Sequence, residues 1–292
     1  MSEPVAIAGS GRIAQSLGRL LRERGECIAA VASQNPANAS AAAAFIGGDT
    51  RAATYAELPQ HAAHILVAVP DDAIASVART LAQAGLHRGV VLHTSGARGP
   101  EALVALASAG VACGALHPLQ TVASPSDGLR VLPGVAFAID GAPEALAWAA
   151  RLVALLGGLP LYIPAASRPL YHAAAVMASN YLIALTAAAV MLMKEAGVDE
   201  ATARRALEPL ARTSIENAFL LGPRAALTGP IARGDAGTVR EHLDALAKAP
   251  ASVSSLYRAA GLATLDIARQ QGLPEYKAGA LEEILRKGKR CD

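Results

Sequence analysis

The stretch Val5-Ala6-Ile7-Ala8-Gly9-Ser10-Gly11-Arg12-Ile13-Ala14 joins an apolar run, a glycine-rich turn and the start of a helical pattern. This G-x-G-x-x-A order is the signature of a dinucleotide-binding turn. Gly9 permits the turn, Gly11 lets the backbone approach a pyrophosphate, and Ala14 lets the helix pack closely on the strand. Free N–H groups at the helix start would face the anion. Glycines also make plain turns, but the strand before and the helix after favour dinucleotide binding.

Short β-type runs then alternate with alanine-rich helical segments, which predicts a parallel sheet covered by helices on both faces. The alternation stops after Pro164, and the pattern from Tyr171 onward is helical. We therefore expect a Rossmann-type domain at 1–164 and an all-helical domain at 165–292. Seven strands are expected, at residues 5–8, 27–32, 64–69, 90–93, 112–116, 135–139 and 159–163.

Composition narrows the class of protein. The 292 residues are 53% hydrophobic, which excludes a disordered chain. The net charge of +2 gives no electrostatic footprint for nucleic acid. Cys27, Cys113 and Cys291 form no CxxC pair, so neither a disulfide framework nor a zinc site is indicated. His61 and His64 lack the partners of a metal site, and none is expected. With no secretion signal visible, we expect a cytoplasmic protein.

Residues 173–193 carry no charged side chain and are nominally long enough to span a bilayer. The segment includes Ser179, Asn180 and Thr186, and it is dominated by alanine, which contributes little hydrophobic transfer energy. These features favour a helix buried on every side in a soluble core over a membrane span. The basic segment 286–290 is interpreted as a solvated helix end.

The residues after the second expected strand bear on the choice of cofactor. An NAD site usually has Asp or Glu there to bind the ribose hydroxyls, whereas this chain has Ser33-Gln34-Asn35. This segment has no carboxylate that would repel a 2′-phosphate, and Arg12 supplies a cation near the phosphates. We therefore expect NADP, with NAD or a deazaflavin hydride carrier as alternatives.

Polar clusters follow three other expected strands, at Val69-Pro70-Asp71-Asp72, His93-Thr94-Ser95-Gly96 and His117-Pro118-Leu119-Gln120-Thr121. In a parallel sheet these ends meet at the edge where ligands bind. Pro70 either shapes the nicotinamide wall with Val69 or only ends its strand, and Asp71 or Asp72 is expected to cap a helix. His117 can exchange a proton near neutral pH, with Ser95 orienting the same oxygen, whereas His93 falls one residue deeper in its strand and is expected to have a structural role.

These motifs, with the start Gly9 to Ala14, the run Tyr171-His172-Ala-Ala-Ala-Val-Met-Ala-Ser-Asn and the run Leu-Thr-Gly-Pro-Ile-Ala-Arg-Gly-Asp, resemble a bacterial family with a Rossmann-like domain followed by a helical domain of unknown function. That family is similar in build to pyrroline-5-carboxylate reductase, the β-hydroxyacid dehydrogenases and prephenate dehydrogenase. The resemblance implies a helical domain of the 6-phosphogluconate-dehydrogenase-like type and a homodimer formed through it. It also places His117 and Ser95 where prephenate dehydrogenases keep a substrate-contacting His-Pro and a serine.

The helical half departs from one relative, since β-hydroxyacid dehydrogenases keep a catalytic lysine where this chain has Tyr171-His172 and the next lysine is Lys194. On one continuous helix, His172 and Ser179 would share a face, with Asn180 about 80° round. They would line the cleft or a dimer interface. Asp235 is expected to cap a helix at 236–247. Thr228 and Arg233 precede it, and Arg233 either binds a substrate carboxylate or pairs with Asp235.

The sequence thus predicts a cytoplasmic NADP-dependent oxidoreductase that moves a hydride to or from a C=O or C=N carbon of a small anionic metabolite. His117, Ser95, His172 and Asn180 are the catalytic candidates. Gly9, Ser10, Gly11, Arg12, Ile13, Ser33, Gln34, Val69 and Pro70 are the candidates for binding the cofactor. The alternative is a non-catalytic protein that binds NADP as a sensor or scaffold.

Overall fold

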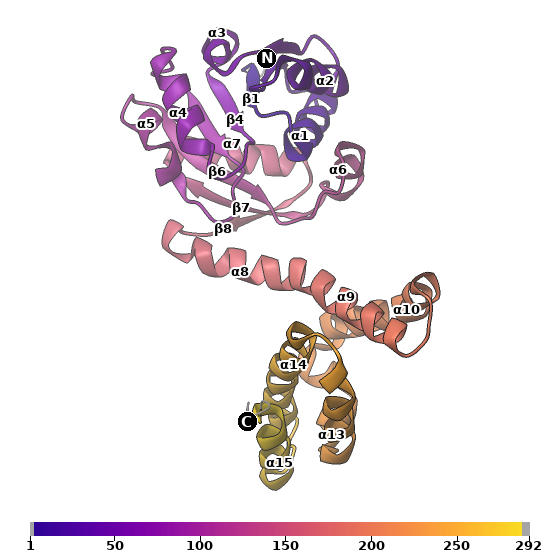
Figure 1. The fold of residues 1–292 in the computed structure, drawn as a ribbon. Coiled ribbons are helices and arrows are strands. Elements are labelled where there is room, and N and C mark those ends of the chain that lie inside the picture. The colour runs from indigo at the N-terminus through magenta and orange to yellow at the C-terminus, as the bar shows by residue number, and fades with distance from the viewer. Residues whose placement is uncertain (1–2, 288–292) are drawn as a thin grey trace. The chain divides into compact units, whose positions relative to one another are not determined.

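A computed structural model describes residues 3–287 of the chain. Their first half forms one eight-stranded sheet in the order β3-β2-β1-β4-β5-β6-β7-β8 (Figure 1). All seven expected strands are confirmed. The strands are β1 Val5–Ala8, β2 Ile28–Ala32, β3 Arg51–Ala53, β4 His64–Val67, β5 Val90–His93, β6 Ala112–Pro118, β7 Ala136–Gly141 and β8 Leu159–Tyr162.

Two features of the sheet differ from the expectation. The strand β3 was not predicted, because its three residues begin with a charged arginine and lie at the sheet edge beside β2. In addition, β7 pairs antiparallel with β6, and β8 runs parallel to β7. The strands β1 to β6 run parallel to one another, so their carboxyl ends meet at one edge.

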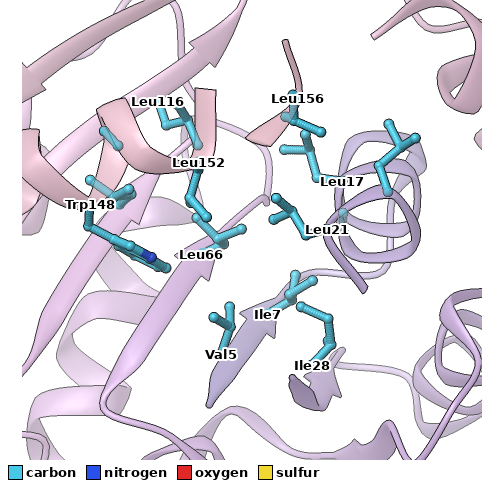
Figure 2. Packing of buried hydrophobic residues seen from close by; sticks show 14 of the residues in the cluster. Val5, Ile7, Leu17, Leu21, Ile28, Leu66, Leu116, Trp148, Leu152 and Leu156 are labelled. Atoms are coloured by element: carbon cyan, nitrogen blue, oxygen red, sulfur yellow. The ribbon is translucent and has the colours of Figure 1, made fainter. Parts of the chain in front are cut away.

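Helices cover both faces of the sheet, as expected. Strand residues alternate between the faces, so Val5 and Ile7 belong to one core cluster and Ala6 and Ala8 to the other. Figure 2 shows the first cluster, in which Leu17 and Leu21 of α1 and Leu152 of α7 meet the strands. The second face is packed by α3, α4 and α5. Within this half the helices are α1 Arg12–Glu23, α2 Pro36–Ile46, η1 Tyr55–Glu57, α3 Leu58–His61, α4 Ile74–Gln83, η2 Pro100–Leu103, α5 Val104–Ala107, α6 Pro125–Val131, α7 Pro143–Leu155, η3 Ala165–Ser167 and α8 Arg168–Ala178.

The contacts divide the chain into two compact units, and the boundary in the sequence lies between Ser179 and Asn180. The second unit is helical, with its own core of aliphatic residues from α12 to α15. Asp199 caps α10 by accepting the N–H groups of Ala201 and Thr202. This unit has α9 Asn180–Glu195, α10 Glu200–Leu221, α11 Pro223–Ala226, α12 Pro230–Arg233, α13 Ala236–Ala245, η4 Leu246–Lys248, α14 Ala251–Gln270 and α15 Glu275–Arg286.

The long apolar segment is not the buried helix that we expected. It is interrupted at Ser179, where the backbone leaves helical geometry (φ −125°, ψ −72°). None of its most apolar window is buried in this chain, and α9 has no buried residue. The expectation was wrong because, in its own unit, α9 packs mainly against α10. By length and composition, the stretch Ala165–Glu195 would suffice to cross a membrane.

Two other segments were only partly predicted. Asp235 does cap α13, accepting the Thr238 N–H at 3.1 Å, but that helix ends at Ala245 rather than at residue 247. Of the basic segment 286–290, Arg286 and Lys287 pair with Glu282 and Glu283. Residues 288–290, and Cys291 with them, lie outside the described part of the chain.

Candidate functional site

A pocket of about 650 Å³ lies at the carboxyl edge of the sheet, within the first unit. It brings together all nine residues that the sequence analysis chose for a cofactor. The signal was local, because each residue lies directly after β1, β2 or β4, either in the connecting loop or, for Arg12 and Ile13, at the start of α1. Sequence reasoning did not choose Asn38, Tyr55, Thr94, Gln120 and Val122, which also line the pocket.

The two glycines of the turn are needed for different reasons. Gly9 has φ +127°, and a Cβ there would lie 2.1 Å from the Ala68 carbonyl oxygen, so the fold itself requires glycine. Gly11 has an ordinary φ of −73°, and a Cβ there would meet nothing within 4 Å. A side chain at Gly11 would therefore occupy open space at the start of α1, where its free N–H groups suit an anion.

The part of the pocket next to Ser33 and Tyr55 is lined by polar side chains and is almost uncharged. The Ser10 hydroxyl donates to the Ser33 oxygen at 2.9 Å, which ties the glycine turn to the end of β2. Burial raises the pKa of Tyr55, whose hydroxyl is hydrogen-bonded to the backbone of Gln34. Arg12 is the one charged residue among those that line the pocket, all of which lie in the described ranges, and no carboxylate is among them. Its Nη1 donates to the carbonyls of Val122 and Ala123.

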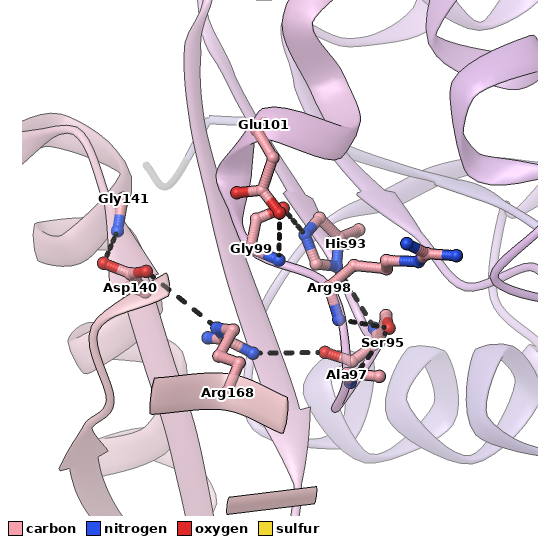
Figure 3. Close-up of polar contacts among 9 residues, drawn as sticks. All are labelled: His93, Ser95, Ala97, Arg98, Gly99, Glu101, Asp140, Gly141 and Arg168. Carbon is pink, nitrogen blue, oxygen red and sulfur yellow. Dashed lines mark hydrogen bonds and ion pairs between the residues drawn. The ribbon is translucent and has the colours of Figure 1, made fainter. Parts of the chain in front are cut away.

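Beside this pocket, the loop after β5 is held by buried hydrogen bonds (Figure 3). His93 is fully buried, and its Nδ1 accepts the Ser95 N–H while its Nε2 donates to the Gly99 carbonyl at 2.9 Å. Burial lowers the pKa of His93. The Ser95 hydroxyl donates to Asp71 Oδ2 at 2.8 Å and accepts the N–H groups of Ala97 and Arg98. The hydroxyl proposed to orient a substrate thus already has three partners in this structure.

The contact with Ser95 also corrects a prediction. Asp71 and Asp72 cap no helix, because α4 begins at Ile74 after Ala73 and has no side-chain cap. As a cap, Asp71 would have accepted backbone N–H groups of its own segment. Its carboxylate instead accepts the Ser95 hydroxyl from the loop after a neighbouring strand.

His117 is the second-to-last residue of β6 and lies against the first residues of α8. Its Nδ1 is 2.8 Å from the Tyr171 hydroxyl, and the His172 ring centroid is 6.1 Å away. Burial, then the nearby His172 and Arg168, lower the pKa of His117 to about 4, and burial raises that of Tyr171 to about 12. Both groups are therefore neutral at pH 7. This differs from the expectation of an imidazole that titrates near neutrality, because β6 and α8 together remove it from water.

Arg168 was missed by sequence reasoning, although its position before Pro169 at a helix start is visible. Its side chain is fully buried, and Nη1 donates to the Ser95 carbonyl at 3.2 Å (Figure 3). Its Nε lies 3.9 Å from Asp140 Oδ2 on β7. Burial lowers the pKa of Arg168, and the Asp140 carboxylate opposes this shift. One guanidinium thus contacts a loop and a strand that are far apart in sequence.

The remaining predicted residues belong to the second unit. Asn180 is the first residue of α9. Thr228 and Arg233 are exposed, the first shortly before the short helix α12 and the second at its last position, and no ion pair within 4 Å joins Arg233 to a carboxylate among the described residues. Their roles as catalytic or substrate-binding residues stay predictions.

The sheet order and the glycine turn define a Rossmann-type protein with an appended helical unit. Residues 3–118 match the family described as a Rossmann-like domain, and residues 135–264 match the domain of unknown function DUF2520. The pair of domains that the motifs resemble is therefore present in this chain. A comparison with curated proteins gives no match.

Solved structures share this fold over almost the whole chain. A candidate NADP oxidoreductase from Bacteroides fragilis is 23% identical with a TM-score of 0.73, covering 92% of this chain and 98% of its own. A Thermotoga maritima protein gives the same identity and TM-score, with 92% and 100% covered. Pyrroline carboxylate reductase from Plasmodium falciparum, solved with NADP bound, is 10% identical with a TM-score of 0.60, covering 97% and 98%. At these identities the likeness shows the fold.

Proposed function

We propose that this protein is an NADP-dependent oxidoreductase that transfers a hydride to or from a C=O or C=N carbon of a small anionic metabolite. The observation that carries the proposal is the pocket after β1, β2 and β4, which all nine predicted residues line and in which Arg12 is the one charge. Two structural neighbours, from Bacteroides fragilis and Plasmodium falciparum, are described by their names as NADP proteins, which supports this choice.

The residues present fit such a cofactor. The open space at Gly11 and the free N–H groups at the start of α1 would hold the pyrophosphate, and Arg12 would add a cation beside it. Ser33, Asn35 and Tyr55 would bind the adenosine end, where the lack of a carboxylate tolerates a 2′-phosphate. Val69, Pro70 and Thr94 would bound the opposite end. When bound, the nicotinamide supplies or takes up the hydride.

His117, oriented by Tyr171, would accept or donate the proton that accompanies the hydride. A neutral His117 receives a proton in the direction of alcohol or amine oxidation, and its hydrogen bond to Tyr171 decides which ring nitrogen is free to do so. In the direction of reduction, the low pKa makes the protonated imidazole scarce at pH 7, so turnover should rise as the pH falls. His172 lies beside this pair, while Ser95 holds the loop next to it.

The second unit would form a homodimer. Large apolar side chains are exposed on α9 and α10, including Ile183 at 67% and Phe219 at 84%. A groove of about 530 Å³, lined by Leu182, Val190 and other residues of these two helices, is part of this surface. Burying it against a second copy would remove the apolar area from water. Asn180 remains a proposed catalytic residue, Thr228 and Arg233 remain the proposed substrate contacts, and a cytoplasmic location remains the expectation.

The deciding experiment is a titration of the protein with NADPH, followed by a panel of small keto and imino acids scored by NADPH consumption. Binding with turnover of at least one compound class supports the oxidoreductase. Tight binding with no turnover across the panel would favour the sensor instead. Failure to bind either nicotinamide cofactor would refute both.

A further inference from the structure

We propose that Arg168 is a positioning residue, which locks the loop at residues 95–99 and the start of α8 together so that Tyr171 meets His117. The inference rests on the proposed function for its catalytic meaning, but its geometry stands apart from it. Arg168 does not line the pocket and is fully buried. A buried guanidinium is costly unless it is paired, so its partners are of structural consequence.

The first element that Arg168 holds is the loop. Its bond to the Ser95 carbonyl joins α8 to the residue directly before Gly96. A Cβ on Gly96 would lie 2.7 Å from His117 Nε2 and 2.7 Å from His172 Nδ1, so this backbone is in close contact with both imidazoles. A displacement of the loop by a few tenths of an ångström would change that contact.

The second element is the helix. Arg168 and Tyr171 are three residues apart on α8 and therefore lie on neighbouring turns of one face. The ion pair with Asp140, at 3.9 Å and without a hydrogen bond, links the start of α8 to β7, the strand that pairs with β6 at His117. The distance of 2.8 Å between Tyr171 and His117 is thus set by a helix whose first turn is anchored on the sheet.

The charge of Arg168 has an effect of its own. The groups that face His117 are His172, Tyr171 and Arg168 from α8, His93 from β5 and Asp71 from the loop after β4. Arg168 is the permanent cation among them, and with burial and His172 it lowers the pKa of His117. Removing it should shift protonation of His117 to higher pH.

The test is nitrogen-15 histidine NMR between pH 5 and 8 on the full-length, cofactor-free protein, with His117→Asn to assign the signal. Arg168→Gln should move the protonation of His117 upward and speed amide exchange at Ala97 and Arg98, which bond to the Ser95 hydroxyl. Arg168→Lys should keep His117 largely neutral, because the cation remains. It should still speed amide exchange at Ala97 and Arg98, because an ammonium lacks the guanidinium fork. The matched control is Arg151→Gln, which removes the two-bonded ion pair with Glu26 elsewhere in the first unit.

If Arg168→Gln fails to fold, Asp140→Asn carries the test, because it keeps the cation and removes one of its anchors. Faster exchange at Ala97 and Arg98 would then support the proposal. The proposal is overturned if a folded Arg168→Gln or Asp140→Asn protein matches Arg151→Gln in both readouts. NADPH titration of the same variants should match wild type. If wild type itself does not bind NADPH, the proposed function fails, while the NMR result still decides the role of Arg168.

Discussion

The hydroxyl of Tyr171 lies 2.8 Å from Nδ1 of His117, although 54 residues separate them in the chain. His117 is on the last strand of the parallel series and Tyr171 is on the helix that crosses to it. Burial is the largest cause of the shifted pKa of each residue, lowering that of His117 and raising that of Tyr171. The pair joins an imidazole to a phenol across two elements of the first unit, and two predictions of the proposed function depend on it.

NADPH should bind more tightly than NADH, because the end of β2 has no carboxylate to repel a 2′-phosphate or to bind free ribose hydroxyls. Isothermal titration calorimetry with both cofactors measures the difference. Introducing a carboxylate with Ser33→Asp should reverse the order. Equal affinity of the wild-type protein for both cofactors would show that the choice lies elsewhere.

Gly11→Val should weaken cofactor binding with little loss of stability, because the added side chain fills open space in the pocket. Gly9→Ala should behave in the opposite way and unfold at a lower temperature, since its Cβ would strike the Ala68 carbonyl and its φ is positive. Thermal unfolding and NADPH titration of both variants separate the two roles. If Gly11→Val binds NADPH normally, no pyrophosphate lies at this turn.

Once a substrate is found, His117→Asn should lower turnover by about 10²–10⁴-fold while keeping cofactor affinity. Tyr171→Phe should lower it less and change its pH profile, because the imidazole keeps its place but loses its hydrogen bond. Ser95→Ala should cost less again in turnover, roughly one hydrogen bond or ~0.5–1.5 kcal/mol. A control is His242→Asn, which removes a histidine–tyrosine bond of the same length in the second unit. Unchanged turnover in His117→Asn would assign proton transfer to another group.

Stability should fall as the pH drops from about 6.5 to 4. In this window the unfolded chain protonates an ordinary imidazole, whereas folded His117 stays neutral until about pH 4, so the unfolded state binds more protons. The buried His93, whose pKa is also lowered, adds to the effect. For His117 alone the loss is on the order of 3 kcal/mol. Urea unfolding at several pH values measures it, and His117→Asn should show a flatter dependence than wild type.

A homodimer should form through α9 and α10. Light scattering at micromolar concentration should give twice the chain mass, and Ile183→Lys should shift the protein toward the monomer, because a charge would be buried in the interface. The matched control is Tyr276→Lys on α15, another exposed large side chain, which should leave the mass unchanged. If the wild-type protein is a monomer, the homodimer is contradicted, and a different partner would have to cover the apolar surface of α9.

Much of the first unit was predictable because its signals are local. A strand followed by Gly9, Gly11 and a helix start needs only neighbouring residues to be recognised, and strands end where prolines and polar clusters begin. The nine pocket residues follow from the same rule, since parallel strands bring their carboxyl ends together. The edge strand β3 gave no such signal, because its three residues, two of them exposed, have neither alternation nor an apolar run.

What the sequence by itself determined is the Rossmann-type sheet and the residues at its ligand edge, because backbone geometry and alternation of apolar residues are short-range properties. Only the tertiary structure decided which groups meet there. Arg168 gained its role from the Ser95 carbonyl and Asp140, and His117 lost its charge at neutral pH because α8 covers it. The exposure of α9 is of the same kind, since burial depends on what packs against a helix and not on its composition alone.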